Sequence, residues 1–253
     1  MLTDRKTILI TGATSGFGLA TANLLAEAGH TLILVGRRTE RLEEIKKTLP
    51  TDVHIATVDV TDREQVKTFF DGLPENLRKI DVLINNAGLA QGLEPAQDAN
   101  VDDWDRMVDT NIKGLLYVLR ATLELMKGQK SGQIINIGSV ASRIPYRGGN
   151  VYGATKAFVN QLSRNLRVDL FGTGIRITNL EPGAAETEFA TVRFNDAEKA
   201  KSFYSDWRPL TPEDVAKTIA WVIDQPPYVN VDNIEIMPLD QANGGLITNK
   251  EVK

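Results

Sequence analysis

Cysteine is absent from the 253 residues and histidine occurs only twice, and these two shortages exclude several kinds of functional site. Without thiols the chain forms no disulfide, no thiolate metal centre and no cysteine nucleophile, a composition compatible with an intracellular protein. The two histidines, His30 and His54, lie beside predicted strands and have no further ligand at a useful spacing. We therefore expect no metal site.

The chain also lacks an excess of positive charge and any long apolar run. Its formal net charge is -4, so it offers no basic surface for a polyanion, and we expect no nucleic-acid partner. No apolar stretch approaches the length of a membrane span, and residues 1–6 lead into a short strand without the apolar core of a signal peptide. We therefore expect a cytoplasmic protein with no membrane partner.

What the sequence does contain is a regular alternation of short β-branched runs and stretches of helical periodicity. Most of the runs are apolar throughout, which is typical of parallel strands covered by helices on both faces. No linker, repeat or low-complexity tract divides residues 1–253, so we predict a single α/β domain with a doubly wound, Rossmann-like parallel sheet of about seven strands. The predicted strands are residues 7–11, 31–35, 53–60, 80–84, 134–137, 175–180 and 234–237.

Apolar residues at helical spacing predict the helices between these strands. One long helix is expected over residues 102–128, another over 152–171, and a capped helix over 211–224. Residues 184–208 are less periodic and predict an insertion with one or two short helices. We interpret about 184–210 as a segment that covers the substrate.

The first predicted turn from strand to helix carries glycines at Gly12, Gly16 and Gly18. Glycine allows a tight turn and lets a pyrophosphate approach the helix N-terminus, where free N–H groups and the helix dipole favour anions. The alternative is that these glycines only end a strand and cap a helix. The position in the first strand-helix-strand unit favours a dinucleotide-binding turn.

The second predicted strand ends in Arg37 and Arg38, where an NAD-binding chain of this architecture places a carboxylate on the ribose. The planar guanidinium binds phosphate through two parallel hydrogen bonds, so the pair favours the 2′-phosphate of NADP. The alternative is a solvent-exposed arginine pair that opens the next helix.

A hydroxyl, a phenol and an ammonium are predicted near one another after the fifth strand. Ser139 ends that strand, a glycine-rich loop follows, and Tyr152 and Lys156 lie four residues apart and so on one face of a helix. A phenol has a pKa of about 10, and nearby positive charge lowers it by favouring the phenolate. The pair could instead be an exposed i,i+4 contact, but Ser139 and the loop favour proton transfer.

In these motifs the chain resembles the short-chain dehydrogenase/reductase family over nearly its whole length. A closer resemblance is to the NADP-dependent 3-hydroxy acid dehydrogenases, also described as serine or allo-threonine dehydrogenases. The family motifs are residues 11–18, Asp59, residues 85–88, Asn111, Ser139, Tyr152, Lys156 and residues 182–183. The subgroup stretches are residues 85–90, 94–95, 109–111, 145–158, 181–183, 187–189, 192–194 and 210–215.

The resemblance implies a role for each matching residue. Tyr152 exchanges a proton with the substrate oxygen, Ser139 hydrogen-bonds that oxygen, Lys156 also binds the nicotinamide ribose, and Asn111 supports a water-linked proton path through its backbone geometry. A homotetramer is also implied. The implied NADP(H)-binding residues are Gly12, Thr14, Ser15, Gly16, Phe17, Gly18, Arg37, Arg38, Asp59, Val60, Asn86, Ala87, Gly88, Tyr152, Lys156, Pro182, Gly183 and Thr187.

For several of these residues a structural role is the alternative. Asn111 could satisfy local backbone groups in its helix, Asp59 could cap the helix that follows it, and Thr187 could cap a short helix. Asn86 to Gly88 could be a simple turn at the end of a strand.

A short acidic substrate needs a local cation on this negatively charged chain, and Arg193 and Arg147 are the candidates. Either could be a solvated surface residue. Together with Ser139 and Tyr152, we place Tyr146 and Asn150 in the substrate pocket. We predict NADP(H)-linked interconversion of a short 3-hydroxy acid and its semialdehyde or 3-oxo acid.

Two alternatives stay open. Two arginines would suit a sulfonate, so one alternative is an NADPH-dependent sulfoacetaldehyde reductase that forms isethionate. The other is a non-catalytic NADP(H)-binding sensor, against which the intact Ser139, Tyr152 and Lys156 argue.

Overall fold

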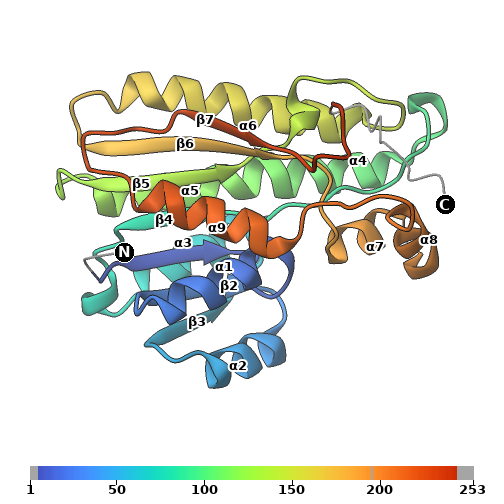
Figure 1. Cartoon of the computed structure of the whole chain (residues 1–253). Helices are drawn as coiled ribbons and strands as arrows, with labels where there is room; N and C mark the ends of the chain where they lie inside the picture. The colour runs from blue at the N-terminus through green and yellow to red at the C-terminus, as the bar shows by residue number, and fades with distance from the viewer. Residues whose placement is uncertain (1–4, 195, 244–253) are drawn as a thin grey trace.

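A computed structural model of the chain describes residues 5–194 and 196–243. Within these residues, seven parallel strands form one sheet in the order β3-β2-β1-β4-β5-β6-β7, with helices on both faces (Figure 1). The predicted doubly wound architecture is therefore confirmed. The strands are β1 (Thr7–Thr11), β2 (Thr31–Gly36), β3 (Val53–Thr57), β4 (Val82–Asn85), β5 (Gly132–Ile137), β6 (Ile175–Pro182) and β7 (Asn233–Ile236).

The helices connect the strands, and the longer ones pack on the sheet. They are α1 (Gly16–Glu27), α2 (Thr39–Thr48), α3 (Arg63–Asp71), α4 (Val101–Val108), α5 (Leu115–Met126), α6 (Asn150–Asp169), α7 (Glu188–Phe194), α8 (Ala197–Phe203) and α9 (Pro212–Ile223). The predicted capped helix is α9, where Thr211 and Asp214 form a capping box ahead of Pro212.

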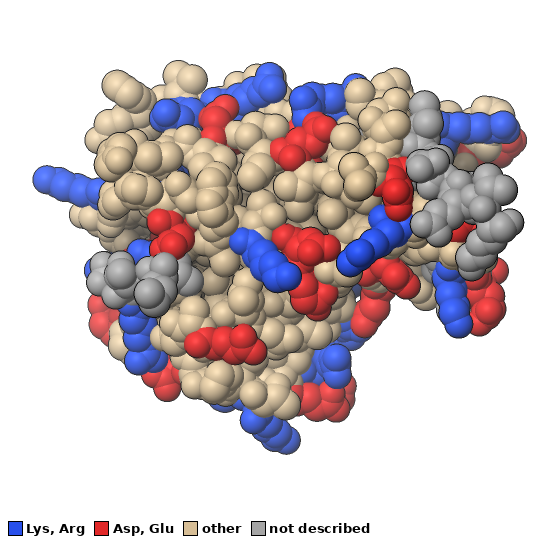
Figure 2. Space-filling view, in the orientation of Figure 1, with Lys and Arg blue, Asp and Glu red and all other residues tan. Residues whose placement is uncertain are grey.

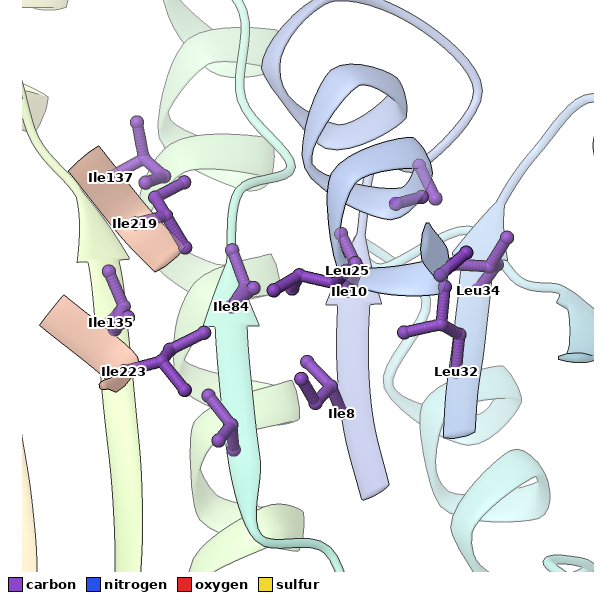
Figure 3. Packing of buried hydrophobic residues seen from close by; sticks show 14 of the residues in the cluster. Ile8, Ile10, Leu25, Leu32, Leu34, Ile84, Ile135, Ile137, Ile219 and Ile223 are labelled. Atoms are coloured by element: carbon purple, nitrogen blue, oxygen red, sulfur yellow. The ribbon is translucent and has the colours of Figure 1, made fainter. Parts of the chain in front are cut away.

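Each face of the sheet has its own hydrophobic core because neighbouring residues of a strand point to opposite faces. Ile8 and Ile10 of β1 join a core under α1 and α9, whereas Leu9 between them joins the core under α3, α5 and α6. Figure 3 shows part of the first core, with Ile84 of β4 between Ile10 of β1 and Ile135 of β5. Burial on both faces explains why these strands are apolar throughout.

The long helix predicted over residues 102–128 is interrupted. The structure has α4, then a π-helical turn at Asp109–Gly114, then α5. Gly114 packs so closely on Val60 that an added Cβ would lie 2.8 Å from Val60 Cγ2. The apolar periodicity continues through the turn, so it gave no signal of the break.

The third strand is shorter than predicted and ends at Thr57 rather than at residue 60. Its partner β2 ends at Gly36, so the ladder has no further residue to pair with. Asp59 instead accepts hydrogen bonds from the backbone N–H and the hydroxyl of Thr61, which turns the chain toward α3. The cap of that helix is Asp62, whose carboxylate accepts from the N–H groups of Glu64 and Gln65.

The two short helices α7 and α8 lie together at one end of the sheet (Figure 1). They fill the less periodic stretch, as predicted, and rings of Phe203, Tyr204 and Trp207 pack on one another beside them. On the face drawn in Figure 2, acidic and basic side chains are interspersed. No helix within the described residues is long and apolar enough to cross a bilayer.

Candidate active site

A cavity of about 490 Å³ opens where the carboxyl ends of the strands meet α7 and α8. In a parallel sheet the segments that follow the strands all reach this edge, which is why it gathers distant parts of the chain. The predicted site residues that line the cavity are Gly12, Thr14, Ser15, Gly16, Phe17, Arg37, Arg38, Asp59, Val60, Asn86, Ala87, Gly88, Ser139, Tyr146, Tyr152, Lys156, Pro182, Gly183, Thr187 and Arg193. The predicted residues outside its lining are Gly18, Asn111, Arg147 and Asn150.

Neighbouring groups fix the conformation of the glycine turn between β1 and α1. Gly12 and Gly16 have φ angles of +66° and +50°, which side chains rarely adopt. The amide of Asn86 donates to the carbonyl oxygens of Thr11, at 2.8 Å, and Gly12, at 3.2 Å, which fixes the turn to the loop after β4. Gly18 supports the turn by packing, because an added Cβ would lie 2.3 Å from Gly12 O.

The two arginines after β2 differ in their surroundings. Arg38 donates from Nε and Nη2 to the hydroxyl of Thr14, at 3.1 and 2.9 Å, and from Nη1 to Glu188 of α7, at 3.1 Å. Arg37 lies 4.0 Å from Asp59 and its side chain is 69% exposed. Arg37 thus presents an accessible guanidinium on the cavity wall, while Arg38 connects the glycine turn to α7.

Ser139, Tyr152 and Lys156 lie together and are buried. Ser139 follows β5 and its hydroxyl accepts a hydrogen bond from Ala141 N at 3.1 Å. Tyr152 and Lys156 share one face of α6, with Nζ of Lys156 at 5.8 Å from the centre of the Tyr152 ring. Nζ donates to Ile137 O at 2.8 Å, which anchors α6 to the end of β5.

Burial dominates the titration of the phenol and the ammonium. It raises the pKa of Tyr152 to about 12, while a hydrogen bond with Ser139 and the charge of Arg193 act in the opposite direction. Burial also lowers the pKa of Lys156 to about 8. The sequence predicted that positive charge would lower the pKa of Tyr152; in the protein alone, desolvation outweighs that effect.

Asn111 lies in the π-helical turn, and its side chain is fully used by the protein. Its amide accepts from Leu89 N at 2.9 Å and donates to Leu89 O at 2.8 Å and to the hydroxyl of Thr155 at 3.0 Å. Thr155 in turn donates to the carbonyl oxygen of Tyr152. Asn111 therefore joins the loop after β4 to the helix that carries the phenol.

Arg193 is the predicted substrate cation that reaches the phenol. Its guanidinium carbon lies 5.2 Å from the ring centre of Tyr146 and 5.4 Å from that of Tyr152. Nη2 donates weakly to Gly148 O at 3.4 Å, and the buried Nε has no hydrogen-bond partner within the described part of the chain. The side chain thus places an unsatisfied donor beside Tyr152.

Arg147 and Asn150 lie outside this arrangement. Arg147 is exposed, and the amide of Asn150 donates to Glu94 O at 3.1 Å. Their positions just before Tyr152 suggested the pocket, but neither residue is among those that line the cavity.

Sequence reasoning missed several residues of the cavity wall. The ring of Phe189 lies 5.7 Å from that of Tyr152, and Tyr204 closes the wall with its hydroxyl donating to Ala185 O. Phe189 belongs to a stretch used for the subgroup resemblance and could have been found there. Tyr204 lies in an aperiodic stretch and gave no signal.

A family model described as short chain dehydrogenase matches residues 6–198. The chain belongs to the short-chain dehydrogenase family. The NADP-dependent 3-hydroxy acid dehydrogenase YdfG of Salmonella typhi is 51% identical over 241 residues, covering 94% of this chain and 97% of that protein. Serine 3-dehydrogenase of Rhizobium radiobacter is 48% identical over 246 residues, covering 97% and 98% respectively.

Solved structures agree with these sequence relatives. The closed form of a serine dehydrogenase complexed with NADP+ superimposes with a TM-score of 0.92 at 48% identity, covering 97% of this chain and all of that one. The serine dehydrogenase of Escherichia coli has a TM-score of 0.83 at 45% identity, covering 93% and 99%. Both the family and the closer resemblance inferred from the motifs are confirmed.

Replacing Lys156 by Met is expected to stabilise the folded protein at pH 7 by about 1–3 kcal/mol while turnover is lost. The folded-state pKa of about 8 lies below the ordinary value of 10.5, so the folded protein binds fewer protons than the unfolded chain between these values. Between pH 8 and pH 10.5 the wild-type free energy of unfolding should therefore rise with pH, and the extra stability of Lys156→Met over wild type should decrease. Urea unfolding at pH 7, 8 and 9.5 measures both effects.

The matched control is Lys127→Met, at an exposed position, which should show no such pH-dependent advantage. A Lys156→Met protein that is less stable than wild type at pH 7 would contradict the prediction.

Proposed function

We propose that this protein is an NADP(H)-dependent oxidoreductase that interconverts a short 3-hydroxy acid, such as serine, allo-threonine or 3-hydroxypropionate, and its semialdehyde or 3-oxo acid. The observation that carries the proposal is the guanidinium of Arg193 beside Tyr152, with a buried Nε that has no hydrogen-bond partner among the residues that the structure describes. A carboxylate bound there would bring the carbon that carries the hydroxyl close to the phenol. The names of the relatives support the same substrate class.

The residues present fit NADP(H). At Gly12 an added Cβ would lie 2.9 Å from the Asn86 amide, so the turn keeps its close packing on the loop after β4 only with glycine there. Ser15 makes no side-chain cap at the N-terminus of α1, and such an N-terminus favours the pyrophosphate. Arg37, with Arg38, would hold the 2′-phosphate. When bound, the nicotinamide supplies or accepts the hydride.

Tyr152 is the proton donor and acceptor in this proposal. Its raised pKa keeps the proton on the phenol at neutral pH, which suits donation to a carbonyl oxygen during reduction. In oxidation the deprotonated form, the phenolate, takes the proton of the alcohol and becomes the phenol, and the Lys156 ammonium favours this phenolate. Ser139 hydrogen-bonds the same substrate oxygen and so positions it.

Asn111 and the segment over the cavity complete the proposal. Asn111 supports a water-linked proton path through the backbone of the π-helical turn, and the segment 184–210 covers the substrate.

We also propose a homotetramer in the cytoplasm. The long helices α5 and α6 offer apolar faces for subunit packing, and light scattering measures the stoichiometry.

A sulfonate substrate is the close alternative, and the structure supports it less than the sequence did. Two arginines were its basis, but Arg147 lies outside the cavity lining and Arg193 is the one that reaches Tyr152. A non-catalytic sensor would not require the buried Ser139, Tyr152 and Lys156. Comparing the turnover of sulfoacetaldehyde with that of malonic semialdehyde distinguishes a sulfonate substrate from a carboxylate substrate. Turnover of any carbonyl compound excludes the non-catalytic sensor.

Arg193→Ala is expected to lower kcat/KM for a 3-hydroxy acid by about 10²-fold, because truncating one partner of a desolvated charge pair costs about 2–5 kcal/mol. The measurement is steady-state oxidation of serine, allo-threonine and 3-hydroxypropionate, with the neutral 1-propanol for comparison. The variant should leave the rate on the neutral alcohol within threefold. Arg147→Ala is the control, and its kcat/KM should stay near wild type.

Equal efficiency of the wild type on acidic and neutral alcohols, or no loss in Arg193→Ala, would contradict the carboxylate site. Loss on both classes of substrate would indicate that Arg193 acts on the phenol rather than on the acid.

Arg37→Ala is expected to raise the Kd of NADP+ by about 10- to 100-fold and to leave that of NAD+ within twofold, because a charge-assisted pair with phosphate is worth about 1.5–3 kcal/mol. Arg38→Ala should weaken both nucleotides, since Arg38 also holds Thr14 and Glu188. Fluorescence titration measures the affinities. Arg41→Ala, in α2 and outside the cavity lining, is the control; equal losses for both nucleotides in Arg37→Ala would refute the phosphate assignment.

A further inference from the structure

We propose that Glu181 is a positioning residue that holds the turn carrying Ser139 against the helix carrying Tyr152 and Lys156. Glu181 lies near the end of β6 and is fully buried. The family's hydride-transfer chemistry is the only premise, so the inference does not depend on which acid is the substrate.

Both oxygens of the Glu181 carboxylate accept hydrogen bonds from protein donors. Oε1 accepts from the hydroxyl of Ser142 and from the Asn160 amide, the latter at 2.8 Å. Oε2 accepts from Arg143 Nη2 at 2.7 Å and from the Asn233 amide at 3.2 Å. A carboxylate with this many donors is held in one orientation, and each donor is fixed in return.

These donors come from the segments that carry the chemistry. Ser142 ends the short turn Val140–Ser142, and its backbone N–H donates to Ser139 O at 2.9 Å. Asn160 lies one helical turn beyond Lys156 on α6. Glu181 therefore bridges the Ser139 turn and the catalytic helix from behind, on the side away from the cavity lining.

Close packing gives this bridge little freedom. An added Cβ at Gly138, the residue before Ser139, would lie 3.2 Å from Cγ of Glu181 and 2.5 Å from Oδ1 of Asn179. One at Gly153, the residue after Tyr152, would lie 3.1 Å from Ala141 O. A shift of the carboxylate would thus be transmitted to the positions of the hydroxyl and the phenol, whose reacting geometry is sensitive to displacements of about 1 Å.

The test is the first turnover of the enzyme–NADPH complex mixed with a saturating carbonyl substrate, followed by nicotinamide absorbance. The substrate is the carbonyl compound that the wild type reduces fastest, so failure of the proposed substrate leaves this test intact. Amplitude reports the active fraction, and the rate constant reports the chemical step. A residue needed only for folding would lower the amplitude alone.

Glu181→Leu, which removes every acceptor, is expected to lower the rate constant by about 10²-fold, and Glu181→Gln, which keeps one, by about tenfold. NADPH affinity should stay within twofold in both. Ser142→Ala removes one hydrogen-bond donor to Glu181 and should lower the rate constant several-fold. This variant tests the proposal if Glu181→Leu does not fold.

Glu235→Gln is the matched control. Glu235 also pairs with Arg143 but, in the described part of the chain, it makes no hydrogen bond with Ser142 or Asn160, so its replacement should leave the rate constant unchanged. The proposal is overturned if Glu181→Gln and Ser142→Ala keep the wild-type rate constant, or if Glu235→Gln lowers it as much as Glu181→Gln does.

Discussion

The desolvation of Tyr152 and Lys156 is the constraint on which the site depends. Burial alone moves both groups toward their neutral forms, raising the pKa of the phenol and lowering that of the ammonium. In the proposed mechanism a phenol that keeps its proton can donate it to a carbonyl oxygen, while an ammonium near its titration range can still favour the phenolate. Ser139 and Arg193 partly offset the burial of the phenol. Burial of the Lys156 ammonium therefore lowers the free energy of unfolding at the proposed site of the reaction.

The sheet determines which residues can meet around this pair. Within the described residues the parallel strands of the sheet, the central ones largely apolar on both faces, have their carboxyl ends at the edge where polar segments gather. Ser139 arrives after β5, Glu181 at the end of β6, and the glycine turn after β1. Asn86 and Asn111 then fix the loop after β4 to the glycine turn and to α6. The site is therefore a set of loops tied to one another by side-chain amides and carboxylates.

The sequence predicted the fold, and it predicted that Tyr152 and Lys156 lie together, because both depend on local patterns. Continuous apolar runs marked the strands, and an i,i+4 spacing put Tyr152 and Lys156 on one face. The π-helical turn around Asn111 could not be predicted, since the apolar periodicity continues through it. Nor could the sequence separate Arg193 from Arg147, because exposure depends on how the loop before α6 turns. The hydrogen bonds of Glu181 join residues 38, 39, 21 and 52 positions apart and follow from tertiary structure alone.

The central claim is that the buried phenol of Tyr152 exchanges the proton with the substrate. The most direct measurement is the pH dependence of the first-turnover rate of alcohol oxidation, in the wild type and in Tyr152→Phe. The account predicts that the wild-type rate rises with pH as the phenol loses its proton, and that Tyr152→Phe loses about 10³-fold or more in rate together with that pH dependence, while still binding NADP+. A Tyr152→Phe enzyme that keeps a rate within tenfold of wild type and the same pH profile would contradict it.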